Sequence, residues 1–220
     1  MTRAYDERYL DDGMNNLGEA VDYAVNACGM EMDTFFKLFV STGYADQFGA
    51  GTPKIVAGLS GTELVWEVVK KAGDAYALPE PQTAYDCSAQ YWCGWSLAYY
   101  QWFTGRPFRD ILQNISAAEL EKLYPTLHEA SEEKFVDTVN SIIRRKNLPT
   151  RLQTLRKQYG YSQRGLAERS GVSLRMIQQY ELRAKDINKA AGGTLLALSK
   201  ALGCRMEDLF EYDASEITDE

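Results

Sequence analysis

The sequence predicts an all-α protein of two helical domains. Three observations support this prediction. Apolar residues recur at intervals of three and four, as on one face of a helix, and no stretch alternates as a half-buried strand would. Charge is also divided unevenly: residues 1–143 carry 10 basic and 21 acidic residues, a net of −11, whereas residues 144–212 carry 14 and 6, a net of +8. We therefore expect an acidic domain over residues 1–146, a basic domain over residues 147–213 and an acidic tail over residues 214–220.

Helix signals follow one another through the acidic domain. Apolar spacing predicts helices over residues 14–28 and 33–42, each followed by a glycine, and a loop over residues 48–53. Capping boxes, in which a serine or threonine precedes a glutamate by three positions, predict helix starts at Ser60, Ser116 and Thr126. A last helix is expected through Phe135 toward the basic residues at 144–146.

Residues 85–103 form an unusually aromatic segment, YDCSAQYWCGWSLAYYQWF. Helical spacing aligns several of its rings along one stripe. One interpretation is a helix buried in the core, because large side chains are most often buried. The other is a contact surface for a partner or a ligand, since aromatic residues concentrate at binding sites. The candidate partner-binding residues are Tyr91, Trp92, Trp95, Tyr99 and Trp102.

Five short helical signals fill the basic domain. The first covers residues 151–158, and the second and third begin at the cap residues Ser162 and Ser173 with Gly171 between them. A fourth covers about residues 194–202, and a fifth runs through Met206 to Phe210. Two helices joined by so short a glycine turn must pack closely at a steep angle.

The pattern Q163-x-x-L-A-x-x-S-G171-V-S-x-x-x-I177-x-x-Y-E181 resembles the Cro/Xre family of phage and bacterial repressors. The resemblance covers about 65 residues and implies a five-helix, helix-turn-helix DNA-binding domain that usually binds as a homodimer. It also implies an ion pair between the first and third helices, here Arg156 and Glu181. This chain departs from many members at Gly165, where they have an acidic residue.

Residue roles follow from this assignment. Leu174, Arg175 and Gln179 are expected to face DNA bases, with arginine suited to guanine, glutamine to adenine and leucine to a thymine methyl group. Gln163 could reach a phosphate or a base edge. Contacts to phosphates that set the register are expected of Arg164, Arg183, Lys185, Asn188 and Lys189, with a merely solvated surface side chain as the alternative for each. The candidate DNA-binding residues also include Ser173 and Gln178.

Several function classes are disfavoured. The four cysteines form no CxxC pair and the chain has one histidine, so neither a metal nor another cofactor is expected. The sequence offers no nucleophile–base pair and no nucleotide motif, so we do not expect an enzyme. No apolar run approaches the length of a membrane span, and no secretory signal pattern opens the chain, so we expect a cytoplasmic protein.

The acidic domain leaves three hypotheses. Its aromatic segment and residues 124–128 resemble segments of Xre-type antitoxins encoded beside small toxins. This resemblance implies a toxin-neutralising domain whose partner is a toxin, with an ADP-ribosyltransferase-like toxin as one candidate, and a regulator that represses its own operon. Alternatively, the aromatic residues enclose a pocket for a small effector, or the domain serves only for dimerisation.

Overall fold

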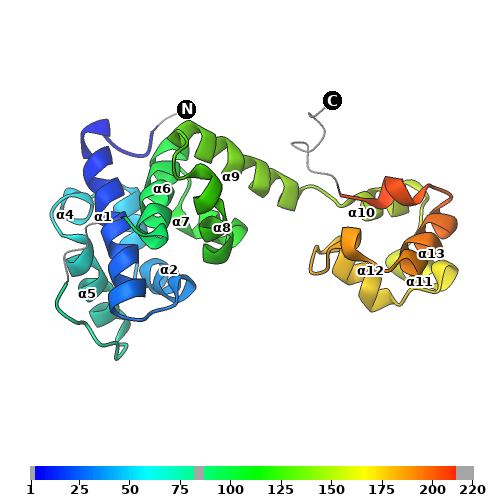
Figure 1. Cartoon of the computed structure of the whole chain (residues 1–220), viewed down its shortest axis with the longest axis horizontal. Coiled ribbons are helices and arrows are strands. Elements are labelled where there is room, and N and C mark those ends of the chain that lie inside the picture. Colours follow the sequence, from blue (N-terminus) through cyan, green and yellow to red (C-terminus); the bar gives the residue numbers. More distant parts are fainter. Residues whose placement is uncertain (1–2, 82–86, 212–220) are drawn as a thin grey trace. The chain divides into compact units, whose positions relative to one another are not determined.

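Every regular element in the described part of the chain is a helix, so the fold is all-α (Figure 1). The computed structural model describes residues 3–81 and 87–211. Contacts divide the chain into two compact units, Met1–Ile143 and Arg144–Glu220. The division falls three residues before the joint expected from the sequence. The predicted acidic tail and the first two residues of the aromatic segment lie outside the described residues.

The N-terminal unit contains most of the helices. They are η1 (Glu7–Tyr9), α1 (Leu10–Asp22), η2 (Tyr23–Ala27), α2 (Met32–Ser41), α3 (Tyr44–Gly49), α4 (Pro53–Val56), α5 (Gly61–Ala72), α6 (Ala89–Thr104), α7 (Phe108–Asn114), α8 (Ala117–Leu127) and α9 (Glu132–Asn147). Of these, η2 is a π-helical continuation of α1, and α9 extends four residues into the second unit. Within the described residues, no helix is long and apolar enough to span a bilayer.

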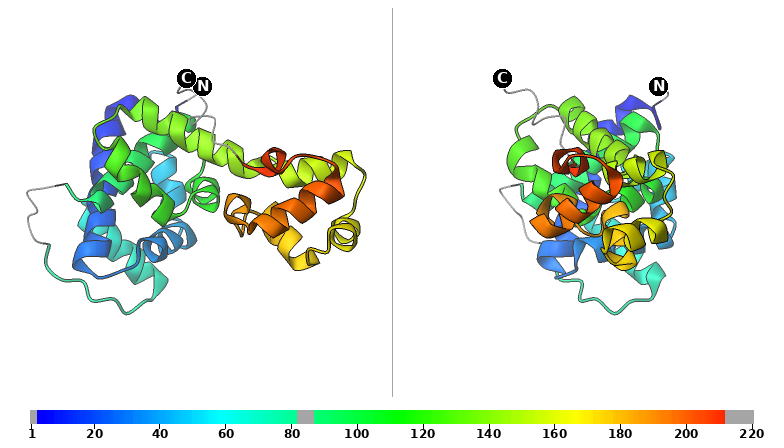
Figure 2. Two further views of the ribbon diagram at one scale, coloured as in Figure 1. Left: turned by 45° about the vertical axis from the view of Figure 1, so that its right-hand side comes forward. Right: turned by 90° about the vertical axis from the view of Figure 1, so that its right-hand side faces the viewer.

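Helices α1 and α6 run side by side through the N-terminal unit (Figure 2). Their backbones meet closely because α6 has a glycine at the crossing. A Cβ atom on Gly94 would lie 2.3 Å from the carbonyl oxygen of Leu17 on α1. Farther along the pair, the ring of Tyr91 on α6 lies against Gly18 on α1. The absence of a side chain at Gly94 and at Gly18 therefore allows α6 to lie this close to α1.

Two local predictions in this unit are wrong. Residues 48–53 are not one loop, because α3 continues through Gly49 and α4 begins at Pro53, a residue suited to the first helical position. Thr126 does not begin a helix. It lies in the last turn of α8, where its hydroxyl donates to the carbonyl of Leu123, and α9 begins only after Ser131. The capping boxes at Ser60 and Ser116 are confirmed.

The C-terminal unit is a smaller helical domain. After the end of α9 it contains α10 (Arg151–Gln158), α11 (Gln163–Ser170), α12 (Leu174–Glu181), η3 (Ile187–Lys189), α13 (Gly192–Leu202) and η4 (Met206–Leu209). The fifth predicted helix is thus a four-residue 3₁₀ turn. The core of the C-terminal unit is built mainly from leucine and isoleucine, including Leu152, Leu166, Ile177 and Leu198.

Candidate nucleic-acid interface

Local signals in the sequence set the angle between α11 and α12. Ser162 caps α11 by accepting a hydrogen bond from the backbone N–H of Gly165 at 2.9 Å, and Ser173 caps α12 by accepting from Met176 at 3.3 Å. Gly171 between them has φ 73°, in the left-handed region that favours glycine. One helix therefore ends and the next begins within three residues.

A buried ion pair joins α10 to the end of α12. Nε of Arg156 donates to Oε1 of Glu181 at 2.6 Å, and a second guanidinium nitrogen donates to Oε2 at 2.9 Å. A third bond reaches the carbonyl of Tyr161 at 2.7 Å. The carboxylate partner raises the pKa of Arg156, so the guanidinium stays charged. The pair implied by the family resemblance is confirmed, and its two parallel bonds fix the orientation of α12.

Gln163 belongs to this network. Its side-chain amide donates to Oε2 of Glu181 at 2.8 Å, and the residue is half-buried. The sequence predicts that this amide reaches a phosphate or a base edge. In the domain without DNA it adds a hydrogen bond to the buried carboxylate, a contact that becomes visible only when α11 and α12 are packed together.

The outer face of α12 is polar and accessible. Helical spacing places Arg175, Gln178 and Gln179 on the side opposite the buried Ile177. Of the candidate residues here, Ser173, Arg175 and Gln178 are exposed, whereas Leu174 and Gln179 are half-buried.

One residue on this face was missed. Leu182 follows the last residue of α12 and falls on the same side as Arg175, with 78% of its surface exposed. The available signal was a leucine that follows Tyr180 and Glu181 and falls outside the three-four apolar spacing of the helix. So large an exposed apolar side chain suits contact with a thymine methyl group.

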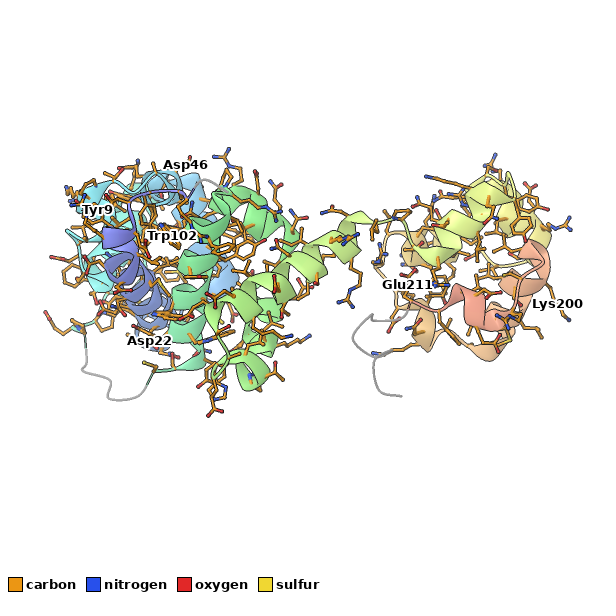
Figure 3. All side chains as sticks on the ribbon, turned by 90° about the horizontal axis from the view of Figure 1, so that it is seen from above. Tyr9, Asp22, Asp46, Trp102, Lys200 and Glu211 are labelled. Atoms are coloured by element: carbon orange, nitrogen blue, oxygen red, sulfur yellow. The ribbon has the colours of Figure 1, made fainter. Side chains whose placement is uncertain are left out.

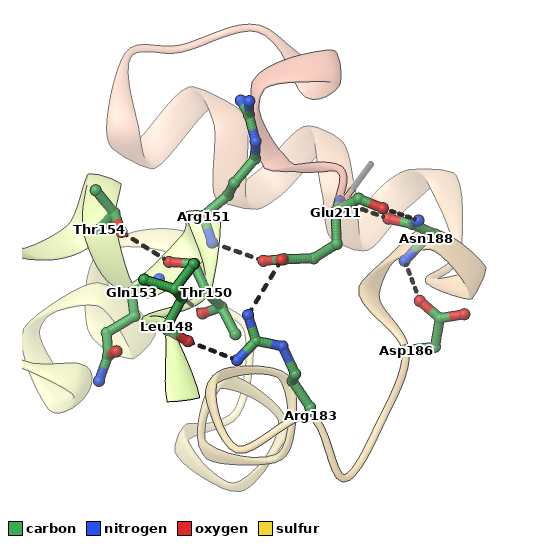
Figure 4. A network of polar contacts seen from close by, with 9 residues as sticks. All are labelled: Leu148, Thr150, Arg151, Gln153, Thr154, Arg183, Asp186, Asn188 and Glu211. Carbon is green, nitrogen blue, oxygen red and sulfur yellow. Dashed lines mark hydrogen bonds and ion pairs between the residues drawn. The ribbon is translucent and has the colours of Figure 1, made fainter. Parts of the chain in front are cut away.

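The candidate cations separate into two groups. Arg164, Lys185 and Lys189 are exposed. Arg183 instead donates to the carbonyl of Leu148 at 2.8 Å and to the Glu211 carboxylate at 3.3 Å. Asn188 exchanges two hydrogen bonds with the backbone of Glu211, at 2.7 and 2.9 Å. Arg183 and Asn188 are therefore held within the domain, a difference from the phosphate contacts expected of them (Figure 4).

The aromatic stripe is largely core. Trp92, Tyr99 and Trp102 are at most 9% exposed, so the prediction that these three form a partner surface is wrong. Trp92 packs edge-on against Phe135 of α9, with ring centroids 5.4 Å apart. Trp102, labelled in Figure 3, donates from its indole N–H to the carbonyl of Tyr5 at 2.9 Å. The remaining two candidates, Tyr91 and Trp95, are half-buried.

The physical reason is that α6 has neighbours on several sides. Helix α1 lies along one side and α8 along another, while residues 3–5 cross the end near Trp102. The sequence contained a signal for this, since residues 89–104 include no charged side chain. A helix without a charged face is typical of a buried position.

The described residues form neither a metal-binding cluster nor a site with a reactive thiol. No group of three histidine, cysteine or acidic side chains there could hold a metal ion. The four cysteines are free. Burial raises the pKa of the Cys93 thiol to about 12, which suppresses its reactive thiolate.

The comparison with protein families locates a match in the C-terminal unit. Residues 152–209 match the helix-turn-helix family model, a span from α10 to η4. No curated protein and no solved structure matches the chain. The matched span contains both capped helices, the turn at Gly171 and the buried ion pair. The C-terminal unit is therefore a helix-turn-helix domain of the kind found in DNA-binding transcription regulators.

Proposed function

We propose that the protein is a sequence-specific repressor whose α12 enters the major groove of an operator. The outward face of α12 carries this proposal. Arg175 has the fork geometry that pairs with guanine, and Gln179 has the amide that pairs with adenine. Exposed Gln178 and Leu182 lie beside them and extend the contact along the groove.

Cations near α12 suit contacts to the DNA backbone. Arg164 lies in the first turn of α11, and Lys185 and Lys189 follow α12. Together with the net charge of +8 over residues 144–212, they would supply attraction to phosphates that is independent of sequence. We expect two copies of the chain on DNA, because dimers of such domains read palindromic sites one helical turn apart.

A gel-shift series on the DNA upstream of the gene for this protein tests the assignment. Arg175→Ala and Gln179→Ala should each weaken operator binding by about 1–3 kcal/mol and relax the preference at one base position. Lys189→Ala should weaken operator and unrelated DNA alike. Lys200→Ala is the matched control, because Lys200 is an exposed cation on α13 that is not on the α12 face. Unchanged operator affinity in both α12 variants would reject the assignment.

For the N-terminal unit, we propose that it binds and neutralises a basic toxin encoded beside it, so that the protein is an antitoxin that represses its own operon. The net charge of −11 supports this function, because acidic side chains accelerate encounter with a basic partner. The surface still offers half-exposed aromatic rings at Tyr91, Trp95 and Tyr124. Such rings can form the desolvated centre of an interface.

Co-expression with the product of the adjacent gene tests this proposal. The full chain carrying Arg175→Ala and Gln179→Ala should still restore growth, because neutralisation does not need DNA. Trp95→Ala should weaken the rescue, whereas Trp66→Ala, a partly exposed tryptophan on α5, should not. A neighbour that is harmless alone, or rescue that requires DNA binding, would reject the antitoxin function.

The effector-sensing alternative has less support. The rings of the stripe pack against other core rings, as in the Trp92–Phe135 contact, and against one another, as in the tilted pair of Tyr99 and Trp102 with ring centroids 5.9 Å apart. They thus fill space that an effector pocket in the stripe would require. A small molecule that co-purifies with the protein and raises its melting temperature would revive this alternative.

A further inference from the structure

A cluster of polar contacts gathers around Glu211, just after the last helical turn (Figure 4). Its carboxylate accepts a hydrogen bond from the backbone N–H of Arg151 at 2.6 Å and the ion pair from Arg183 at 3.3 Å. Its backbone N–H and carbonyl bond to the side chain of Asn188. Arg183 also reaches the carbonyl of Leu148. Three segments that are distant in sequence therefore meet at one side chain, and we call these contacts the Glu211 clamp.

The clamp holds a backbone conformation that is otherwise unfavourable. Arg183 has φ 55°, and among the described residues it is the only one other than glycine with a positive φ. A residue with a Cβ atom is unfavourable in this left-handed region, because the Cβ lies too close to the following carbonyl oxygen. The side chain at that position is the one that bonds to Glu211 and Leu148. A glycine at position 183 would remove the backbone strain, but it would also remove the hydrogen bonds to Leu148 and Glu211. The arginine therefore keeps these bonds in spite of the strain.

The segment held in this way directly follows α12 and carries two exposed cations. Arg183 and Asn188, the two clamped side chains, enclose Lys185 in sequence, and Lys189 follows Asn188 at once. Ile187 is buried between them and anchors the segment to the core. The segment has contacts of its own beside the clamp: the backbone N–H of Lys185 donates to the carbonyl of Gln179 at 3.1 Å, and Asp186 caps η3 and lies 3.9 Å from the ammonium of Lys189. The clamp adds to these contacts at both Arg183 and Asn188.

Beside the clamp lies an open hollow of about 390 Å³ whose lining includes Arg145, Arg183 and Lys185 as well as the acids Asp186 and Glu211. Since the Glu211 carboxylate is bonded to Arg183, its charge is balanced within the clamp. Lys185 stands at this hollow with 3.6 Å between its ammonium nitrogen and the sulfur of Met176, a residue of α12. The exposed side chain thus lies beside the helix that is proposed to read the bases.

We propose that Glu211 is a positioning residue for DNA binding: the clamp holds Lys185 and Lys189 where they meet the phosphates that flank the groove occupied by α12. The proposal rests on the function proposed for α12. It differs from a direct contact by Arg183 in the sign of one prediction. If Arg183 met the phosphates itself, removing the Glu211 charge would free it and strengthen binding. If the clamp positions the lysines, the same change weakens binding.

Binding of the full chain to a fluorescent 30-base-pair duplex of mixed sequence, over a series of salt concentrations, tests this. Glu211→Gln should weaken binding about three- to tenfold and lower the salt slope, because each lost phosphate contact removes about 0.9 from the slope. The matched control is Glu168→Gln on α11, which removes the charge of an exposed acid. Glu168→Gln raises the net charge by the same amount as Glu211→Gln but does not touch the clamp. It should therefore leave DNA binding unchanged or make it slightly stronger.

A second background separates positioning from a general loss of structure. In a Lys185→Ala/Lys189→Ala protein, Glu211→Gln should have no further effect on affinity, because the residues it positions are gone. All measurements are made well below the melting temperature of each variant. If Glu211→Gln does not fold, Asn188→Ala breaks the other half of the clamp and should produce the same loss of slope.

The proposal is overturned if Glu211→Gln binds as tightly as the wild type or more tightly, or if its weaker binding persists undiminished in the double-lysine background. A wild-type chain that does not bind the duplex at all would instead reject the DNA-binding function itself.

Discussion

Fully buried aromatic rings, among them Phe35, Phe39 and Tyr100, fill the centre of the N-terminal unit. In the described part of the C-terminal unit the core is mainly aliphatic, with the ring of Tyr180 and the buried Arg156–Glu181 ion pair beside it. The difference follows size. A domain of about 70 residues buries a smaller share of its surface than one twice as long, so its core supplies less stability. In the C-terminal unit, hydrogen bonds and ion pairs between helices therefore contribute more to fixing the helix orientations.

The comparison teaches where a mutation should act. In the N-terminal unit, changes in side-chain volume should have the largest effect on stability, because the backbones of α1 and α6 are in contact at Gly94. In the C-terminal unit, charge pairing should decide, because Arg156 and Glu181 would each be costly to bury alone. The two units can be followed separately, since all four tryptophans lie in the N-terminal unit and fluorescence reports that unit alone.

The largest effect is expected from Glu181→Ala. It leaves the buried guanidinium of Arg156 without its carboxylate and should destabilise the C-terminal unit by about 3–5 kcal/mol. Circular dichroism should show helix lost at a lower temperature, while the tryptophan transition stays in place. Glu168→Ala, an exposed acid in the same unit, is the control. If Glu181→Ala melts like the wild type, the ion pair does not hold this unit together.

Gly94→Ala should have a slightly smaller effect, in the other unit. The added methyl group would press on the Leu17 carbonyl, which is backbone and cannot move aside, so we expect a loss of about 3 kcal/mol. Tryptophan fluorescence during denaturation measures it. Gly192→Ala in α13, where a Cβ meets nothing within 4 Å, lies in the other unit; it should leave the tryptophan transition in place and be neutral or slightly stabilising when circular dichroism follows the C-terminal unit. A Gly94→Ala protein whose tryptophan transition matches that of the wild type would contradict close packing of α1 on α6.

Gly165→Ala should act in the opposite direction. The glycine lies in the first turn of α11, and the nearest atom to an added Cβ is the hydroxyl oxygen of Ser162 at 3.3 Å. Because alanine favours a helix over glycine by about 1 kcal/mol, the C-terminal unit should become more stable by up to that amount. Chemical denaturation followed by circular dichroism gives the value. A loss of stability would mean that the cap at Ser162 is displaced.

The smallest effect concerns the pH dependence of one helix start. Hydrogen bonds from the backbone N–H and the hydroxyl of Ser60 lower the pKa of Glu63. A carboxyl whose pKa is lower in the folded state stabilises the fold above its unfolded pKa, and this contribution disappears as pH falls through the folded pKa. Glu63→Gln keeps an acceptor but cannot titrate, so below about pH 4.5 the stability of the N-terminal unit should fall less steeply in this variant than in wild type.

The start of α11 offers the contrast. Ser162 caps this helix with Gly165 at the position that Glu63 occupies in α5, so no carboxylate takes part. Replacement of Ser162 by alanine should therefore give a change in stability that does not vary with acid pH. For the Glu63 prediction, parallel curves of stability against pH for wild type and Glu63→Gln between about pH 3 and 5 would show that the capping box contributes no pH-dependent stability.

Local order was determined by the sequence. Helix starts at Ser60, Ser162 and Ser173 and the turn at Gly171 follow from short-range hydrogen bonds and from the positive φ that glycine accepts, so neighbours in the chain suffice to predict them. The Arg156–Glu181 pair was available through family resemblance. The failed prediction at Thr126 is also local, because a capping pattern does not exclude a position inside a helix that is already formed.

Only the tertiary structure decided which side chains remain available. Trp102 carries the same aromatic signal as Trp95, but residues 3–5 cross over it. Arg183 is a cation like Lys185, but an acid 28 residues later binds it. Exposure and pairing depend on segments brought together by packing, and the free energy of those contacts is summed over distant residues. A pattern read along the chain identifies which residues could bind DNA or a partner, and the folded domain determines which of them are free to do so.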